Sequence, residues 1–397
     1  MARKPKRDLT VEEQLARGPL DLPFLMLTML LLGVGLIMMF SASFATAYYN
    51  DGDPLVYIKN QAVYAAAGVV VMFLVSKINY QTFRLLSVPG IVAAILLLVL
   101  ALSPLGVELN EVKRWVRIGP IQLQPSEVAK VAVILFFATR LSKRDTEKKK
   151  KWSRRTLTGR TLERLDRIGF LELVPYGLIL LLIVGLMMLE PHMSGTILIL
   201  AGAAAVLFAA GIKLYWFAGG GAALMGLVVL MMSGYQSTRI LVWQDPWAYP
   251  RDGGYQIIQS LYAIGSGGLL GLGLGKSRQK FLYLPEPEND FIFAIVCEEL
   301  GLIGAGIVLI LFALLVMRGY WIAIHARDRF GALLVVGITT LTAVQVFLNI
   351  SVVTNLIPTT GISLPFFSYG GTALMIQLAE MGIILSVSRQ IPAPRQE

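Results

Sequence analysis

The chain has 397 residues, of which 56% are hydrophobic and only 15% are charged. Soluble domains carry about 25% charged residues, so this apolar excess excludes an ordinary soluble protein and indicates a polytopic membrane protein. The net charge of +10 is then expected to come from basic cytoplasmic loops, and we expect no nucleic-acid partner. A single cysteine, Cys297, excludes an intrachain disulfide, and two histidines argue against a histidine-based metal site.

Ten stretches are long and apolar enough for spanning helices, which need about 20 mainly apolar residues. They lie at residues 21–46, 60–77, 85–104, 125–142, 170–189, 193–211, 214–233, 290–317, 331–354 and 370–388. The sequence therefore predicts an all-α integral membrane protein of about ten transmembrane helices, forming one domain over 21–388. Residues 193–233 fit either two helices or one long re-entrant element.

Lysine and arginine predict how these spans are oriented, because cytoplasmic loops are enriched in both. Four segments are strongly basic: the tail 1–20, the loop 141–168, the loop 318–330 and the tail 389–397. Ten spans place all four on one side, which we take to be cytoplasmic, so that both termini are cytoplasmic. The loops expected outside are 47–59, 105–124, 355–369 and the large extracytoplasmic loop 234–289 between spans seven and eight.

Asp290 lies where the large outer loop meets an apolar helix. It fits an N-cap, where the helix dipole favours an acid by about 0.3–1 kcal/mol. The cap is the favoured interpretation, and the residue also fits a partly desolvated acid with a raised pKa, suited to general base work. Both roles are compatible. Glu298 lies about 12 Å deeper along the same helix, too far to pair with Asp290, so we expect it to bond another helix, for example at Lys130.

The outer loop 105–124 contains three cations, Lys113, Arg114 and Arg117, on the side where positive charge is depleted. They suit a phosphate or pyrophosphate, and pairing with nearby acids or lipid explains them equally well. Ser126 is expected to cap the following helix. Glu127 and Lys130 are three residues apart and can pair on one helix face.

Two further outer segments are rich in glycine. The run 265–277 nearly matches a nucleotide-binding loop, but Leu270 stands where that motif needs glycine, and we reject it. The stretch 255–265 before it has the pattern of a short interfacial helix. The loop 355–371 carries hydroxyls that include Ser368 and Tyr369, and its backbone must be buried in protein or line a cavity. A sugar-binding lining and internal satisfaction of the loop fit equally well.

Several motifs together resemble the family of shape, elongation, division and sporulation proteins. They are Lys113–Trp115, Gln124–Lys130, Leu284–Glu286, Asp290–Ala294, Glu298–Gly301 and Pro365–Gly371. The resemblance covers all ten spans in order. Within the family, Pro358–Gly361 and Glu190–Thr196 are more similar to the division and sporulation branch than to the elongation branch.

This resemblance implies a peptidoglycan glycosyltransferase of the bacterial cytoplasmic membrane that polymerises lipid II at the outer face, for division or sporulation. The implied substrate is an undecaprenyl-pyrophosphate disaccharide-pentapeptide. The implied partners are a monofunctional class B penicillin-binding transpeptidase and other division or sporulation membrane proteins. Asp290 matches the family's essential aspartate. His192 stands where many members have an acid, so no role is transferred to it.

In the mechanism that the resemblance implies, Asp290 takes the proton from the acceptor hydroxyl or orients it, and cations stabilise the leaving pyrophosphate. The residues expected to bind substrate are Lys113, Arg114, Arg117, Glu127, Lys130, Arg239, Ser368 and Tyr369. No protein metal site is expected, although a divalent cation, Mg²⁺ or Mn²⁺, could share the charge. Two other functions stay open: a flippase for lipid-linked precursors, and a non-catalytic division scaffold.

Overall fold

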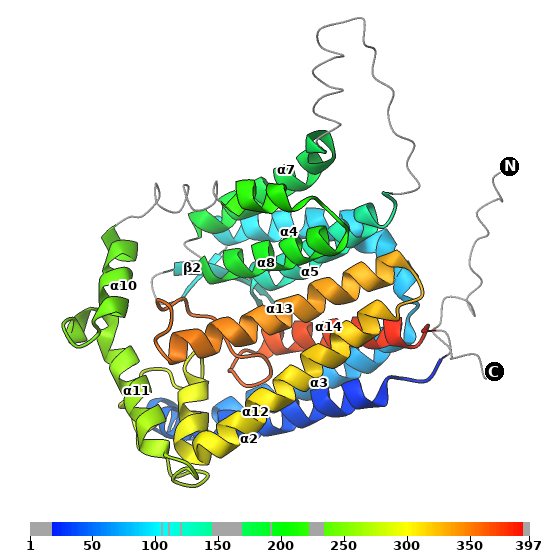
Figure 1. The fold of residues 1–397 in the computed structure, drawn as a ribbon. Helices are drawn as coiled ribbons and strands as arrows, with labels where there is room; N and C mark the ends of the chain where they lie inside the picture. The colour runs from blue at the N-terminus through cyan, green and yellow to red at the C-terminus, as the bar shows by residue number, and fades with distance from the viewer. Residues whose placement is uncertain are drawn as a thin grey trace, which may run out of the picture.

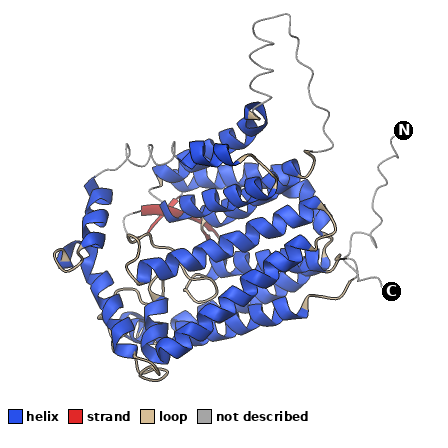
Figure 2. Ribbon diagram, in the orientation of Figure 1, coloured by secondary structure: helices blue, strands red, loops and turns tan. Residues whose placement is uncertain are grey.

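The protein is a bundle of long helices that run roughly side by side, with a small sheet at one end (Figures 1 and 2). A computed structural model describes residues 18–104, 106–109, 112–119, 121–144, 169–190, 193–221 and 234–391. Its longer helices are α2 (Leu22–Asp51), α3 (Val56–Lys77), α4 (Ser87–Leu102), α5 (Pro125–Leu141), α7 (Phe170–Leu189), α8 (Met193–Ala209), α12 (Ile292–Ile324), α13 (Arg329–Val353) and α14 (Gly371–Ser388). The shorter ones are η1 (Tyr80–Leu86), α10 (Gly234–Gln244), η2 (Pro250–Gly254) and α11 (Tyr255–Gly267).

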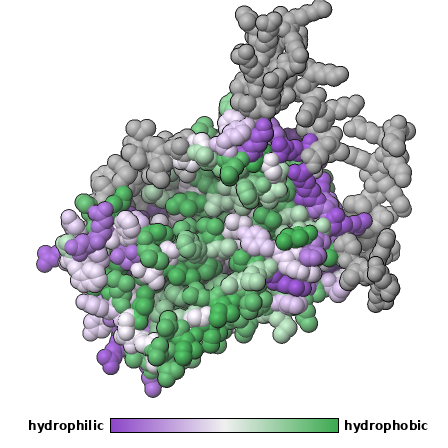
Figure 3. Space-filling model, in the orientation of Figure 1, coloured by the Kyte–Doolittle hydropathy of each residue, from purple (hydrophilic) through white to green (hydrophobic). Residues whose placement is uncertain are grey.

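Nine of the ten predicted spans coincide with the nine longer helices of the described ranges. Seven helices there are long and apolar enough to cross a membrane, counting η1 and α4 together, whereas α5 and α8 have 17 residues each. In the remaining predicted span, residues 214–221 are helical and 222–233 lie outside the described residues. Figure 3 shows hydrophobic surface across the middle of the bundle and hydrophilic surface toward its ends. The chain is a multi-pass membrane protein.

The loop before α5 contains β-structure that the sequence did not lead us to expect. Strands β1 (Gly106–Leu109), β2 (Val112–Ile118) and β3 (Ile121–Leu123) form a three-stranded antiparallel sheet in that order. Thr372 at the start of α14 donates to the Gln122 carbonyl oxygen at 2.8 Å, so the sheet is fastened to the bundle. Strand pairing satisfies the backbone groups of a segment that must leave the membrane and return to it.

Interactions between distant segments define two ends of the bundle. At one end Arg318 of α12 makes a bidentate ion pair with Asp21 just before α2, the shortest contact being 2.7 Å. At the same end Arg389 donates to the Gly18 carbonyl oxygen at 2.8 Å. The described residues nearest the two termini therefore lie at one end, as an even number of spans requires. The sheet, α10, α11 and the first turns of α12 lie at the other end (Figure 1), and Asp290 comes two residues before α12.

Two predicted helix caps are wrong. Helix α5 begins at Pro125, which supplies a preset backbone angle at the first position, and its cap residue Gln124 makes no side-chain hydrogen bond. Ser126 thus lies inside the helix. Helix α12 begins at Ile292 and its cap residue is Phe291, which makes no side-chain hydrogen bond. Asp290, the predicted cap, therefore lies one residue before the actual cap. The predicted interfacial helix at 255–265 is confirmed as α11.

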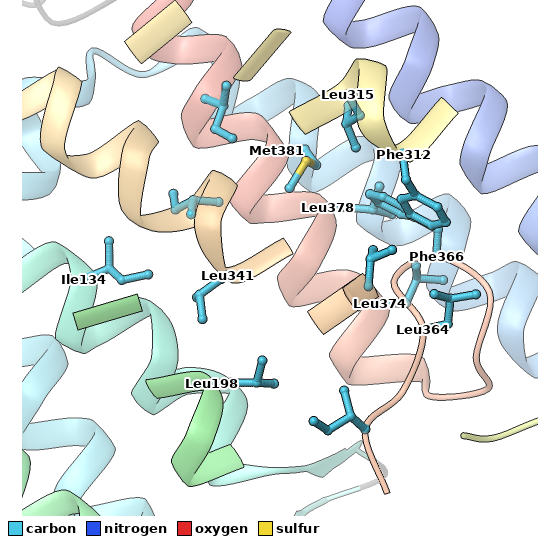
Figure 4. Packing of buried hydrophobic residues seen from close by; sticks show 14 of the residues in the cluster. Ile134, Leu198, Phe312, Leu315, Leu341, Leu364, Phe366, Leu374, Leu378 and Met381 are labelled. Carbon is cyan, nitrogen blue, oxygen red and sulfur yellow. The ribbon is translucent and has the colours of Figure 1, made fainter. Parts of the chain in front are cut away.

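The loop between α13 and α14 enters the bundle, as its sequence predicts. Phe366 and Phe367 are buried and pack on Phe312 of α12, whose ring centroid lies 6.5 Å from that of Phe366 and 5.7 Å from that of Phe367. Figure 4 shows the contact of Phe312 with Phe366. A Cβ atom on Gly35 of α2 would lie 2.3 Å from the Phe366 carbonyl oxygen, so α2 touches the loop backbone. Non-helical backbone at this position is therefore covered by protein.

Candidate functional site

The Asp290 carboxylate faces the loop between α13 and α14. Asn349 of α13 donates through its side-chain amide to two carbonyl oxygens, those of Asp290 and Ile362, both at 2.7 Å. A Cβ atom on Gly361 would lie 3.8 Å from Asp290 Oδ2, so the loop backbone stands beside the carboxylate. The Asn349 side-chain amide thus fixes the backbone of Asp290 relative to the loop between α13 and α14, which the carboxylate faces.

The surroundings of Asp290 favour its protonated form more than water does. The pKa of Asp290 is raised from 3.8 to about 6, mainly by burial; the charge of Glu286 also raises this pKa, and the charge of Arg239 lowers it. The side chain is only partly covered, so a substrate hydroxyl can reach it. A carboxylate with a pKa near 6 is ionised at neutral pH and is a much better proton acceptor than an ordinary aspartate.

A second acid with a raised pKa, the buried Glu288, precedes Asp290 by two residues, and sequence reasoning missed it. Burial raises the pKa of Glu288 to about 7, and the charges of Glu286 and Asp290 contribute. Thr46 at the end of α2 donates to the Glu288 carboxylate at 3.5 Å. The spacing of three acids in 286–290 was the available signal, since carboxylates this close oppose each other's ionisation.

Ser368 and Tyr369, both predicted to bind substrate, hold the backbone of the acidic segment. The Ser368 hydroxyl donates to the Asn289 carbonyl oxygen at 2.6 Å and accepts from the Leu364 N–H at 2.7 Å. The Tyr369 N–H donates to the Glu288 carbonyl oxygen at 2.8 Å. These bonds favour internal satisfaction of the loop as the role of the Ser368 hydroxyl.

Glu127 and Lys130 line a cavity beneath this loop. Their predicted ion pair is present at 2.8 Å, and the Lys130 side chain is 4% exposed. The cavity is about 30 Å³, room for about two water molecules. Its lining also includes Gln345, Ser363, Ser368, Tyr369, Gln377 and Glu380. Four residues predicted to bind substrate therefore meet at one polar cavity.

The predicted bond between Glu298 and Lys130 is wrong. The Glu298 carboxylate accepts from the N–H groups of Arg278 and Gln279, at 2.9 and 3.4 Å, and from the Ser277 hydroxyl. The large loop folds back along α12 and supplies these donors, and the helix that bonds Glu298 is α11, whose Ser266 hydroxyl donates to the carboxylate at 3.4 Å. Sequence spacing alone does not reveal such a return.

The cations predicted to bind substrate lie in different parts of the structure. Arg239 of α10 acts on the Asp290 charge and donates to the Thr359 carbonyl oxygen at 3.0 Å. On β2, Arg117 is exposed, and Arg114 donates to the Glu190 carbonyl oxygen at 3.3 Å. Lys113 pairs with Glu108 in the β-ladder, and its side chain lies outside the described residues. Arg239 thus acts on the Asp290 charge, and β2 carries its cations on the sheet at the same end of the bundle.

Glu190, at the end of α7, is buried at 2% exposure beside Arg114. Burial raises the pKa of Glu190 to about 7, although the Arg114 charge lowers it. His192 lies outside the described residues. Within the described residues, no three His, Cys, Asp or Glu side chains come together in a way that suits a metal ion.

Comparison with known proteins agrees with this architecture. The family described as "Cell cycle protein", which covers FtsW, RodA and SpoVE, matches residues 22–392. Stage V sporulation protein E of Bacillus subtilis is 42% identical over 93% of this chain and 97% of its own length. A probable peptidoglycan glycosyltransferase FtsW of Trichlorobacter lovleyi is 38% identical over 93% of both chains.

Solved structures show the same fold. A chain from a peptidoglycan synthase complex that coordinates polymerization and crosslinking matches with a TM-score of 0.73 and 28% identity, over 95% of this chain and 99% of that chain. The rod shape determining protein RodA of Thermus thermophilus matches with a TM-score of 0.66 and 27% identity, over 94% and 98%. The chain belongs to the FtsW, RodA and SpoVE family of cell cycle proteins.

Proposed function

We propose that this protein is a peptidoglycan glycosyltransferase that polymerises lipid II for cell division or sporulation. The relatives named as probable glycosyltransferases, aligned over nearly the whole chain, support this activity. The observation that carries the proposal is the partly exposed Asp290 carboxylate, with its raised pKa, beside Arg239. A proton acceptor next to a cation, at one end of a membrane bundle, suits transfer between two lipid-linked sugars.

The proposed reaction uses Asp290 as general base. It takes the proton from the 4-hydroxyl of the acceptor sugar as that oxygen bonds to the anomeric carbon of the donor. The bond from that carbon to the diphosphate breaks, and undecaprenyl pyrophosphate leaves with the bonding electrons. Negative charge grows on the leaving group, so Arg239, with Arg114, Arg117 and Lys113 on β2, would stabilise the transition state.

The same proposal covers location, partner and ions. Asp290 faces the outside of the bacterial cytoplasmic membrane, and both termini are cytoplasmic. A monofunctional class B penicillin-binding transpeptidase is the proposed partner, supported by the likeness to a synthase complex that joins polymerization to crosslinking. Other division or sporulation membrane proteins are further proposed partners. A divalent cation, Mg²⁺ or Mn²⁺, would enter bound to the substrate diphosphate.

Purified protein supplied with lipid II tests this function. We expect glycan polymer in detergent, with the partner transpeptidase present where the chain alone is inactive. Exchange of lipid II between leaflets of liposomes without polymer would show a flippase instead. Neither polymer nor exchange, with the partner present, would favour a scaffold.

A further inference from the structure

Helix α12 is interrupted at Gly301, and the large loop fills the interruption. Gly301 has φ 69° and ψ −173°, so the helical hydrogen bonds cannot pass through it. The N–H groups of Leu302 and Ile303 donate instead to the carbonyl oxygens of Gly268 and Leu269, at 2.9 and 3.1 Å. The break lies about 14 Å along the helix from its first residue. The loop therefore descends beside the first turns of α12.

Hydrogen bonds in the opposite direction, from the loop to α12, complete this contact. The carbonyl oxygens of Glu298 and Glu299 accept from the N–H groups of Leu272 and Gly273, at 2.9 and 3.0 Å. A Cβ atom on Gly271 would lie 2.2 Å from the Glu299 carbonyl oxygen, so the two backbones are in direct contact. The groups freed by the break thus find partners in one loop segment.

The Glu299 side chain then holds the returning part of the loop. Its carboxylate accepts from the N–H groups of Gly275 and Ser277, at 2.9 and 3.2 Å, and from the Ser41 hydroxyl of α2 at 2.7 Å. Lys280 supplies the counter-charge, with Nζ 3.0 Å from Glu299 Oε1. A buried carboxylate with this many donors is fully satisfied.

Lys280 is itself buried, at 2% exposure, and all three of its ammonium hydrogens have acceptors. They are the Glu299 carboxylate, the Ser41 hydroxyl at 3.0 Å and the Gly275 carbonyl oxygen at 2.7 Å. The ammonium group thus joins α2, α12 and the loop at one point. Removing one member of such a buried pair leaves an uncompensated charge.

The segment from Lys280 to Asp290 is held at both ends. Its far end is fixed by the bonds from Asn349, Ser368 and Tyr369 to three consecutive carbonyl oxygens, those of 288–290. Between the two anchors, Leu282 and Glu286 have φ of 66° and 46°, which non-glycine residues adopt only when held there.

We propose that Lys280, through its buried pair with Glu299 and the Ser41 hydroxyl, is a positioning residue for Asp290. The inference rests on the proposed function and deepens it. The pair fixes where the acidic segment begins, and α13 with its following loop fixes where it ends. Loss of the first anchor lets the segment shift, and a displacement of about 1 Å at a reacting group costs roughly 100-fold in rate.

The test compares three variants with a matched control. The variants are Lys280→Met, the double variant that combines Lys280→Met and Glu299→Gln, and Ser41→Ala. The control, Arg318→Gln, breaks the ion pair with Asp21 that joins the start of α2 to α12 at the opposite end. The double variant removes both buried charges, so it separates loss of positioning from loss of folding. The charged groups that act on Asp290, namely Arg239, Glu286 and Glu288, stay unchanged in all four.

We expect Lys280→Met and the double variant to lower kcat for polymerisation by roughly 10- to 100-fold with KM nearly unchanged, and Ser41→Ala to lower it less. Amide hydrogen exchange over 281–291 should accelerate in the same order. Arg318→Gln should lower the melting temperature without either effect. A folded double variant with normal kcat and exchange would overturn the inference, as would equal loss of kcat in Arg318→Gln. If wild-type protein makes no polymer, the proposed function fails, and exchange still decides the role of Lys280.

Discussion

The basicity of Asp290 is set mainly by burial and adjusted by two opposing charges. Together they bring the pKa of Asp290 to about 6, with the charge of Glu286 raising it and the charge of Arg239 lowering it. Below that pKa the group carries a proton and cannot accept another. The rate of a reaction that needs it as base must therefore rise with pH through about 6 and level off above it.

Neutralising Glu286 or Arg239 should move the acid limb of the pH–rate profile, the range in which the rate rises with pH, in opposite directions. Glu286→Gln removes the negative charge that raises the pKa, so the limb should shift to lower pH. Arg239→Gln removes the positive charge that lowers it, so the limb should shift to higher pH. The measurement is the pH dependence of kcat for lipid II polymerisation.

The control is Asp53→Asn, an acid that pairs with exposed Lys59 at 2.8 Å. The acid limb of the pH–rate profile of Asp53→Asn should lie at the same pH as that of the wild type. Shifts of the same sign in Glu286→Gln and Arg239→Gln would contradict the assignment of the limb to Asp290.

At the scale of elements, α13 aligns the site through one side chain. Asn349 bonds the carbonyl oxygens of Asp290 and Ile362, which belong to segments 72 residues apart in the chain. Because α13 is rigid, it holds the segment of Asp290 and the segment of Ile362 in place, and their separation does not depend on the conformation of either segment alone.

Asn349→Ala should therefore damage both stability and activity. It leaves two carbonyl oxygens without their donor, at a cost of about 1–3 kcal/mol for each that stays dry. It also frees Asp290 to move, so kcat should fall by roughly 10- to 100-fold. The measurements are the melting temperature and the polymerisation rate.

Thr342→Val is a matched change on the same helix. Within the described part of the chain, its buried hydroxyl bonds only the Ile338 carbonyl oxygen of its own helix, at 3.2 Å. It should keep normal kcat. An Asn349→Ala protein with normal kcat would show that α13 does not align the site.

Much of this arrangement was predictable, and the remainder depends on contacts between distant segments. The spans followed from apolar runs, and the pair of Glu127 with Lys130 followed from helical spacing. Asn349 was missed because an amide within an apolar helix has no local signal for its partner. Glu298 was given the wrong partner because the return of the loop to α12 depends on backbone contact at Gly301 and Gly271. The sheet was missed because its strands are only three to seven residues long.

At the scale of the whole molecule, the two ends of the bundle differ in composition. Two arginines of the basic segments, Arg144 and Arg329, come together at one end, where both donate to the Ala210 carbonyl oxygen, at 2.9 and 2.8 Å. The other end carries the acidic segment 286–290. This asymmetry agrees with the cytoplasmic assignment of the basic end.

Cysteine labelling tests that orientation directly, because the only native thiol, Cys297, is buried. In a Cys297→Ala background, Asp51→Cys at the end of α2 should react with an impermeant maleimide in intact cells. Lys143→Cys beyond α5 should react only after permeabilisation. The reverse pattern would place Asp290 on the cytoplasmic side and would contradict the proposed orientation.

The central claim is that the Asp290 carboxylate accepts the proton in lipid II polymerisation. The most direct test is the single-turnover polymerisation rate of purified Asp290→Asn, whose side chain has the same shape but cannot act as a base. We predict a loss of about 100- to 10,000-fold, with a melting temperature equal to or above that of wild type, since the partly covered position no longer carries a charge. A folded Asp290→Asn protein that polymerises lipid II at the wild-type rate would contradict the account.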